Sequence, residues 1–511
     1  MVLARLLSFL LIFFCSFPTI FAQNKDTVRF VLSMDEPAAH KVHVVLKCHA
    51  DNSPVDFKMP QWTPGYYQIM NFWRNLRDFQ VTNDQGKILK WEKVNDFTWR
   101  VYPDRAGVLT LQYTVLADRS FVANSFIDTT HAYITPAATF LYIDHRLSSP
   151  ASLTVEPYKD WSRVAVGLDS VAGKKYTYRS PDFDLLFDCP ILAGNLEELP
   201  SFTVRGIPHR FIGYQLGDFD KVQFMADLKK IVGAAVKIMD DIPYKQYTFL
   251  AIGPGNGGIE HLTSSALSFT GKEVGRNKKR VLSFIAHEYF HHYNVKRVRP
   301  IELGPFDYDN GSKTRQLWIS EGWTVYYEYI LLKRAGIFTD NDLYIAFQNN
   351  MNAYETKTGR HYQSLAQASE DTWSDGPFGR KGDTIVKTIS YYEKGPVVAL
   401  MLDFAIRHHT GNRRSLDDVM RRLYREYYKK KKRGFTETEF QKVCQEVAGD
   451  PLTELFIYVN TTQELDYPKY FNYGGLAVDP VSEKGKAFSI HPMQNPGILE
   501  AEILKGWLIQ D

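Results

Sequence analysis

Cysteine is scarce in this sequence. Its 511 residues contain only 4 cysteines, and one of them, Cys15, lies in an apolar amino-terminal run. If that run is removed, Cys48, Cys189 and Cys444 remain, and three scattered cysteines can form at most one disulfide. A small scaffold held together by several disulfides is therefore excluded.

The sequence also lacks an excess of charge of either sign. Lysine plus arginine number 61 and aspartate plus glutamate 58, so the overall field gives no reason to expect a nucleic-acid partner. A short basic run at residues 429–433 follows a predicted helix, and we interpret it as a solvated helix end. Internal repeats and low-complexity linkers are absent from the sequence, and its length predicts two to four hydrophobic cores.

Long apolar runs are missing except at the amino terminus. Residues 6–14 form an apolar run, interrupted only by Ser8, after a single positive charge, and the small residue Ala22 precedes Gln23. The run is too short to span a membrane, and the pattern predicts a signal peptide at residues 1–22. We therefore expect an exported protein, periplasmic or secreted, without a stable membrane span after cleavage.

A β-strand pattern is followed by a helical pattern along the rest of the chain. Segments such as 28–33 and 109–115 cluster or alternate β-branched and aromatic residues between turn residues, which predicts an antiparallel β-sandwich. This β-strand pattern continues to about Tyr214. Helical periodicity then dominates, with helices predicted at 224–239, 280–298, 317–335, 390–410 and 415–428.

The predicted helix at 280–298 carries the pattern His287-Glu288-x-x-His291. Residues four apart lie on one face of a helix, so the two imidazoles could bind one zinc ion at about 2.0–2.1 Å. Glu288 is offset by one position, from which it could take a proton from water at the open side of the ion. The alternative is that both histidines are packed in an aromatic-rich helix.

A catalytic zinc site normally needs a third protein ligand. The metzincin arrangement is excluded because the position six residues after His291 is Arg297. Glu321 is the best candidate, since its neighbours are apolar and a buried carboxylate without a cation would cost several kcal/mol. Three other carboxylates fall in a polar loop and are expected to lie on a solvated surface: Glu302, Asp307 and Asp309.

Two segments around these residues resemble a known family. The run from His287 to Pro300, HEYFHHYNVKRVRP, and the run at 319–327, ISEGWTVYY, resemble the glycyl aminopeptidase family of zinc metallopeptidases. Its members are gluzincins related to thermolysin and to the larger zinc aminopeptidases. The resemblance implies that His287, His291 and Glu321 bind zinc and that Glu288 acts as general base and acid.

A glycine-rich segment is similar to a substrate-binding motif of related aminopeptidases. Gly257-Gly258-Ile259-Glu260-His261 is similar to their Gly-x-Met-Glu-Asn motif. The similarity implies that Gly257 and Gly258 let a peptide approach the backbone and that Glu260 binds its α-amine. The alternative is an ordinary turn with a solvated Glu260, and the role of His261 is left open.

A third segment, Tyr391-Tyr392-Glu393-Lys394-Gly395, resembles the Tyr-Glu-Lys-Gly motif of the larger aminopeptidases. That motif's tyrosine donates a hydrogen bond to the oxyanion, and alignment of the motif selects Tyr392. Tyr391 is expected to be a packed neighbour, although the adjacent pair leaves the assignment between them open.

The resemblance implies an α+β multidomain fold, with landmarks at 60–66 and 188–190. We expect an N-terminal antiparallel β-domain at 23–200, a thermolysin-like, mainly helical catalytic domain at 201–460 and a short extension at 461–511, too short for a complete PDZ domain. The implied activity is removal of a small first residue, such as glycine or alanine, from a peptide with a free amino terminus. The alternatives are a zinc endopeptidase on the same scaffold and a catalytically silent peptide-binding protein.

Overall fold

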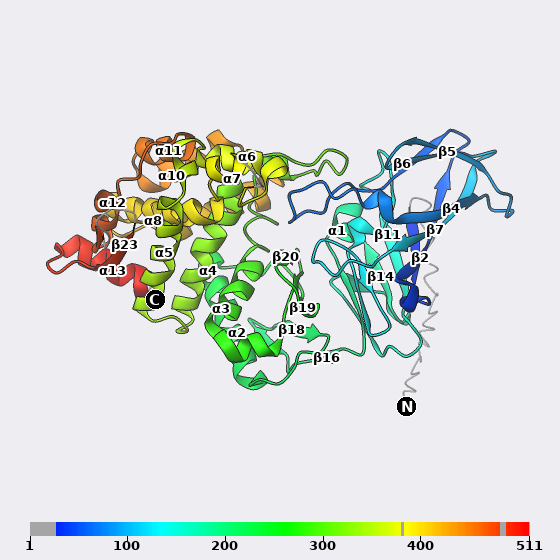
Figure 1. The fold of residues 1–511 in the computed structure, drawn as a ribbon, viewed down its shortest axis with the longest axis horizontal. Helices are drawn as coiled ribbons and strands as arrows, with labels where there is room; N and C mark the ends of the chain where they lie inside the picture. Colours follow the sequence, from blue (N-terminus) through cyan, green and yellow to red (C-terminus); the bar gives the residue numbers. More distant parts are fainter. Residues whose placement is uncertain (1–26, 380–382, 481–486, 510–511) are drawn as a thin grey trace, which may run out of the picture.

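The computed structural model describes residues 27–379, 383–480 and 487–509. The predicted signal peptide at 1–22 lies outside the described residues. A β-rich unit, blue to cyan in Figure 1, lies beside a unit dominated by helices, green to red. Among the described helices, none has the length and apolar character needed to cross a membrane. The predicted α+β multidomain fold is confirmed, whereas the boundaries at 200 and 460 stay predictions.

Three sheets build the β-rich unit. The largest has the strand order β13-β14-β11-β1-β2-β7-β4, and it comprises β1 (Val28–Ser33), β2 (Lys41–Ala50), β4 (Leu76–Thr82), β7 (Gly107–Leu116), β11 (Ala151–Glu156), β13 (Asp169–Ser170) and β14 (Thr177–Ser180). The second comprises β3 (Val55–Lys58), β5 (Lys90–Asn95), β6 (Thr98–Tyr102) and β10 (Tyr142–Ile143). The third comprises β8 (Phe126–Ile127), β9 (His131–Ile134), β12 (Arg163–Val166) and β15 (Ile191–Gly194).

Alternating side chains hold these sheets in place. Every second residue of β2 is buried, as expected for a strand with one face on the core. One pair departs from the predicted antiparallel pattern, because β1 and β11 run parallel. Parallel neighbours need a long connection, and here most of the unit's strands lie between them.

A mixed sheet begins the second unit. Its strands are β16 (Glu197–Glu198), β17 (Phe202–Val204), β18 (Ile207–Gly213), β19 (Tyr247–Ala251), β20 (Gly258–Glu260) and β21 (Ser264–Leu267). Helix α3 contacts both β20 and β21, and α2 contacts β17 and α3. The edge strand β20 therefore lies next to the helix that carries His287 and ends directly before His291.

Helices form the rest of the molecule. The α-helices are α1 (Phe183–Phe187), α2 (Lys221–Met239), α3 (Gly271–Phe290), α4 (Trp323–Arg334), α5 (Asp340–Glu355), α6 (Leu365–Asp375), α7 (Asp383–Lys387), α8 (Tyr391–His409), α9 (Leu416–Leu423), α10 (Glu437–Ala448), α11 (Thr453–Asn460), α12 (Tyr467–Tyr473) and α13 (Ile498–Ile509). Short 3₁₀ turns are η1 (Pro37–Ala39), η2 (Phe72–Asn75), η3 (Pro136–Ala138), η4 (Ile301–Leu303) and η6 (Thr358–His361), and two π-helical turns are η5 (Trp318–Gly322) and η7 (Tyr424–Lys431).

The helix predicted at 280–298 has different bounds in the structure. It begins earlier, at Gly271, and ends at Phe290. The chain then turns back, and the Nδ1 atom of His291 lies 2.7 Å from the carbonyl oxygen of Asn294. This side-chain hydrogen bond holds the turn that follows the helix.

The basic run and the carboxyl-terminal segment have local partners. Lys429 pairs with Asp241 at 2.7 Å, and Lys431 and Arg433 pair with Glu439 at 3.1 and 2.7 Å, so half-solvated ion pairs account for much of the run. In the segment after residue 460, α12 and α13 pack on α8. The hairpin of β22 (Leu476–Pro480) and β23 (Phe488–Pro492) packs on α12 and α5. Trp507 of α13 is fully buried and extends the helical core.

Candidate metal centre

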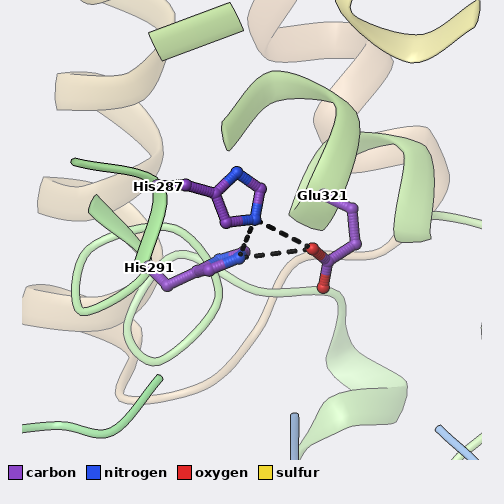
Figure 2. A group of neighbouring side chains, drawn as sticks. All are labelled: His287, His291 and Glu321. Atoms are coloured by element: carbon purple, nitrogen blue, oxygen red, sulfur yellow. Dashed lines mark hydrogen bonds and ion pairs between the residues drawn. The ribbon is translucent and has the colours of Figure 1, made fainter. Parts of the chain in front are cut away.

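Three predicted ligands meet at the end of α3. The Nε2 atoms of His287 and His291 lie 2.9 Å apart, and Glu321 Oε2 lies 3.6 and 3.2 Å from them (Figure 2). All three side chains are buried, and they form a possible metal-binding group. Ligands at about 2.0–2.1 Å in a tetrahedral zinc site lie about 3.3 Å from one another, so the observed triangle has the size that zinc needs.

The hydrogen bond at the Nδ1 atom of each imidazole determines which ring nitrogen can bind a cation. His287 Nδ1 lies 3.0 Å from a carboxylate oxygen of Glu328, and His291 Nδ1 lies 2.7 Å from the carbonyl oxygen of Asn294. Both partners only accept hydrogen bonds, so each Nδ1 carries a proton, and in the neutral imidazole each Nε2 presents a lone pair. In that state two lone pairs and a carboxylate oxygen at this distance repel each other, and a proton or a metal ion between them removes the repulsion.

The electrostatics of the trio lead to the same conclusion. Burial alone would raise the pKa of Glu321, but the imidazoles of His291 and His287 hold it below its usual value. Burial likewise opposes a charge on His287, yet hydrogen bonds to Glu321 and Glu328 raise the pKa of its imidazole well above the usual range. The surroundings therefore favour an ionised carboxylate and positive charge at the imidazoles, which a divalent cation would supply.

Glu328 is a site residue that the sequence interpretation missed. It lies seven residues after Glu321, two turns further along the helical segment, and the hydroxyl of Ser283 also donates a hydrogen bond to it. That spacing is the signal that could have identified it, because residues seven apart share one helix face. Glu328 orients His287 from outside the metal group.

Replacing Glu328 with glutamine should weaken metal binding without removing a ligand. Loss of a carboxylate that orients a metal-bound histidine typically costs about 10- to 100-fold in affinity. We expect this loss in a zinc competition titration with a chromophoric chelator. Glu370→Gln is the matched control, because this carboxylate pairs with Arg315 on the exposed surface. Unchanged zinc affinity in Glu328→Gln would contradict the orienting role.

Close packing of helix backbones positions Glu321. Glu321 lies in the wide π-helical turn η5, which leads directly into α4. The segment predicted as one helix at 317–335 therefore consists of a π-helical turn and an α-helix. A Cβ atom on Gly322 would lie 2.7 Å from the Cα of Gly395 in α8, so this contact requires glycine. The Nδ2 atom of Asn294 donates to the carbonyl oxygen of Ile319 at 2.8 Å and ties the ligand helix to this turn.

Glu288 lies beside the group and faces strand β20. A Cβ on Gly258 would lie 2.5 Å from the carboxyl carbon of Glu288, so the glycine lets the strand approach the carboxylate. Burial raises the pKa of Glu288 to about 7, against the opposing effect of His287 and His291. A carboxyl group with this pKa can both accept and release a proton near neutrality.

Glu260 is a buried residue of β20 and not a solvated one, so the ordinary-turn alternative is wrong. Only 3% of Glu260 is exposed, and among the described residues its Oε1 atom has no hydrogen-bond partner. Gly257, which directly precedes β20, has φ of +86°, which glycine adopts without strain. Asp188 supports this strand, because it accepts from the backbone of Leu262 at 2.6 Å and pairs with Lys296 at 2.8 Å.

The two adjacent tyrosines differ in their surroundings. The hydroxyl of Tyr391 lies 3.0 Å from Thr372 Oγ1, which makes it a packed neighbour. The ring of Tyr392 lies 6.2 Å from that of His287. Burial, followed by the charge of Glu321, raises the pKa of Tyr392 well above its usual value. Tyr392 is therefore a protonated phenol at the metal group.

An open cleft leads away from the centre. It has a volume of about 660 Å³, and its walls include Gly258, His287, Glu288 and Tyr392 near the centre and Arg280 further along α3. The cleft lies between β20, α3, α4 and α5. His292, one residue after the second ligand, is buried among aromatic rings instead, with its ring stacked on Tyr289 at 4.6 Å.

The acidic loop between the ligands is only partly solvated. Glu302 and Asp307 are exposed, as expected. Asp309 is not, because it pairs with Lys58 of the β-rich unit at 2.8 Å and accepts a hydrogen bond from Tyr142. The expectation of a solvated surface is therefore wrong for this residue, since its partners come from a distant part of the chain.

Similar structures have the same two-unit architecture. An aminopeptidase N family protein from Idiomarina loihiensis is 24% identical, with a TM-score of 0.84 over 89% of this chain and 79% of that one. An M1 zinc metallopeptidase from Deinococcus radiodurans is 13% identical, with a TM-score of 0.55 over 86% and 95%. Leukotriene A4 hydrolase from Saccharomyces cerevisiae is 14% identical, with a TM-score of 0.54 over 87% and 67%. These likenesses concern the fold.

Family models identify the chain more directly. Comparison with curated proteins gave no match. The model of the peptidase M61 N-terminal domain matches residues 29–195, and the model of the M61 glycyl aminopeptidase matches residues 280–398, which include all three clustered side chains. Together the two matches cover more than half of the sequence. The chain therefore belongs to the M61 glycyl aminopeptidase family, and it is a metallopeptidase.

Proposed function

We propose that this metallopeptidase is a zinc aminopeptidase that removes a small first residue from peptides with a free amino terminus. The observation that carries the proposal is the buried Glu260, which has an oxygen without a partner among the described residues and lies beside the metal group. An unpaired buried carboxylate is costly, and a protonated amine is the partner that would satisfy it.

His287, His291 and Glu321 would hold the zinc ion, which supplies Lewis acidity toward water and the scissile carbonyl when bound. Glu288 is placed to accept the proton of the attacking water. It then passes this proton to the departing amine, a double role for which its pKa of about 7 is suited. Glu260 holds the α-amine and so sets the scissile bond as the first one.

Tyr392 would donate its phenolic hydrogen to the oxyanion that forms on the carbonyl. Tyr392→Phe is expected to lower kcat by about 10²–10³-fold, as for removal of a single oxyanion donor, with little change in KM. Steady-state kinetics with alanine p-nitroanilide measure both constants. Tyr391→Phe is the matched control, because that hydroxyl contacts Thr372. If only Tyr391→Phe lowers kcat, the two assignments must be exchanged.

Comparison of free and blocked peptides tests the proposed function. The wild-type enzyme should cleave Ala-Ala-Phe at its first bond and leave N-acetyl-Ala-Ala-Phe intact, because acetylation removes the charge that Glu260 binds. Equal cleavage of both peptides would favour the endopeptidase alternative. Binding of either peptide without hydrolysis, by a sample that contains zinc, would favour the silent peptide-binding protein.

Export of the chain is also part of the proposal. Its support is the apolar run at residues 6–14 with Ala22 at the expected cleavage position. Mass spectrometry of the protein from exported fractions should find a mature amino terminus at Gln23. A chain that keeps residues 1–22 and stays inside the cell would contradict export.

A further inference from the structure

A loop of the β-rich unit, residues 60–67, reaches the metal centre of the helical unit. Trp62 and Tyr67 of this loop belong to the hydrophobic core that surrounds the ligand helices, and not to the core of their own sheets. Trp62 is fully buried, and Tyr67 is 8% exposed. Their rings lie 5.0 and 6.2 Å from the ring of Trp373 in α6. The 60–67 loop is therefore part of the catalytic unit's packing.

The loop is held by an exchange with the segment that joins the metal ligands. The backbone N–H of Gln61 donates to the carbonyl oxygen of Tyr308 at 2.8 Å. The indole N–H of Trp62 donates to the carbonyl oxygen of Asp307 at 2.7 Å. In return, the ring of Tyr308 packs in the core of the β-rich unit, and its hydroxyl donates to Asp184 at 2.7 Å. Each unit thus places residues in the other, which fixes the position of the 60–67 loop.

The middle of the loop lies directly on Glu260. Gly65 has φ of +98°, and a Cβ there would lie 2.9 Å from Glu260 Oε2 and 2.8 Å from Ile259 Cγ2. Two residues later, the phenol of Tyr67 lies near the carboxylate of Glu321. Burial, followed by the charges of Glu321 and Glu260, raises the pKa of Tyr67 well above its usual range, so the phenol lies close to both carboxylates.

This position is where the first side chain of a bound peptide must lie. In the proposed function the α-amine is at Glu260 and the scissile carbonyl is at the metal group. Only two bonds, of about 1.46 and 1.52 Å, separate the amine nitrogen from the carbonyl carbon. The Cα atom between them, and its side chain, therefore lie between Glu260 and the metal group, in the region where Tyr67 lies near both Glu260 and Glu321.

The two ends of the site differ in openness. The cleft of about 660 Å³ opens along α3 from His287 and Glu288. Away from this opening, Glu260 and Glu321 are only 3% and 2% exposed, and Gly65 of the 60–67 loop packs directly against Glu260. A long first side chain would have to displace the ring of Tyr67.

We propose that Tyr67 is a specificity-determining residue, which closes the binding site for the first side chain and restricts it to the size of glycine and alanine. The inference rests on the proposed aminopeptidase function, because the amine contact at Glu260 defines which side chain meets the ring. The substrate class that follows is peptides with an unblocked glycine or alanine at the amino terminus.

Truncation of Tyr67 tests the proposal through a ratio of specificities. The zinc-loaded enzyme is assayed with glycine, alanine and leucine p-nitroanilides, and kcat/KM is measured for each. Wild type should prefer glycine and alanine to leucine. In Tyr67→Ala the leucine-to-alanine ratio of kcat/KM should rise at least about 10-fold, since pocket discrimination of even one methylene reaches this size.

Three further variants separate specificity from general damage. Tyr67→Val is a second truncation in case Tyr67→Ala does not fold, as judged by circular dichroism and melting temperature. Tyr67→Phe keeps the ring and should keep the wild-type ratio. Tyr66→Ala is the matched control, because the ring of Tyr66 packs against Phe121, 5.2 Å away. Its ratio should also stay at the wild-type value.

Two results would overturn the proposal. A wild-type enzyme that cleaves leucine p-nitroanilide as efficiently as alanine p-nitroanilide has no closed site, whatever the variants do. A folded Tyr67→Ala or Tyr67→Val with a ratio within twofold of wild type shows that the ring is not the wall. If wild type cleaves alanine substrates and the variants give this second result, only the role of Tyr67 is overturned. If wild type cleaves no unblocked substrate, the proposed function is overturned as well.

Discussion

Glu288→Gln is expected to lower kcat by about 10²–10⁴-fold, the usual contribution of a general acid–base group, while the protein keeps its zinc. Glutamine has nearly the same size and hydrogen-bonds in the same place, but its amide cannot accept a proton from water at neutral pH. The carboxylate is not one of the three clustered ligand side chains, so the ion should stay bound. Kinetics with alanine p-nitroanilide and metal analysis of the same sample measure both effects.

The conservative variant Glu288→Asp separates the proton transfer from packing. It keeps the carboxylate but draws it back by one methylene, away from the backbone of Gly258 on which Glu288 packs. We expect partial activity from Glu288→Asp and almost none from Glu288→Gln. A Glu288→Gln enzyme with substantial activity and full zinc content would show that another group is the base.

Glu321→Gln is expected to cost the centre its metal. The substitution keeps the volume of the side chain but removes the negative charge that lies 3.2 Å from His291 Nε2. Loss of a supporting residue outside the metal group costs about 10- to 100-fold in affinity, so loss of a direct ligand should exceed 100-fold. Zinc affinity from chelator competition, and activity at limiting zinc, should both fall.

Glu302→Gln is the control for that experiment, because Glu302 is an exposed carboxylate on the loop between the ligands. It removes the same charge from the chain without touching the centre, and zinc affinity should stay at the wild-type value. If Glu321→Gln binds zinc as tightly as wild type, the third ligand has been assigned to the wrong residue, and the proposed chemistry loses its basis.

Much of the fold could be predicted because its causes are local. The alternation in β1 predicted a strand with the bounds that the structure has. Thr436 and Glu439 form reciprocal capping hydrogen bonds at the start of α10, a pattern that their residue types and spacing favour. Helix ends were less predictable, since α3 ends at Phe290 through a side-chain contact of His291 that no periodicity reveals.

By itself, the sequence determined which side chains could bind a metal. His287 and His291 share one face of a helix whatever surrounds them, because 3.6 residues per turn brings positions four apart together. The family resemblance, which two matched models confirm, rests on the same short stretches of residues. These are properties of segments that a single helix or strand contains.

Only the tertiary structure decided how the centre is completed. The contact of Glu321 with the imidazoles depends on the packing of η5 against α3 and α8. The position of Tyr67 near Glu321 depends on the residues that the β-rich unit and the helical unit place in each other. Such contacts join residues far apart in the chain. Their distances are set by the summed packing of a whole core, which local propensity does not encode.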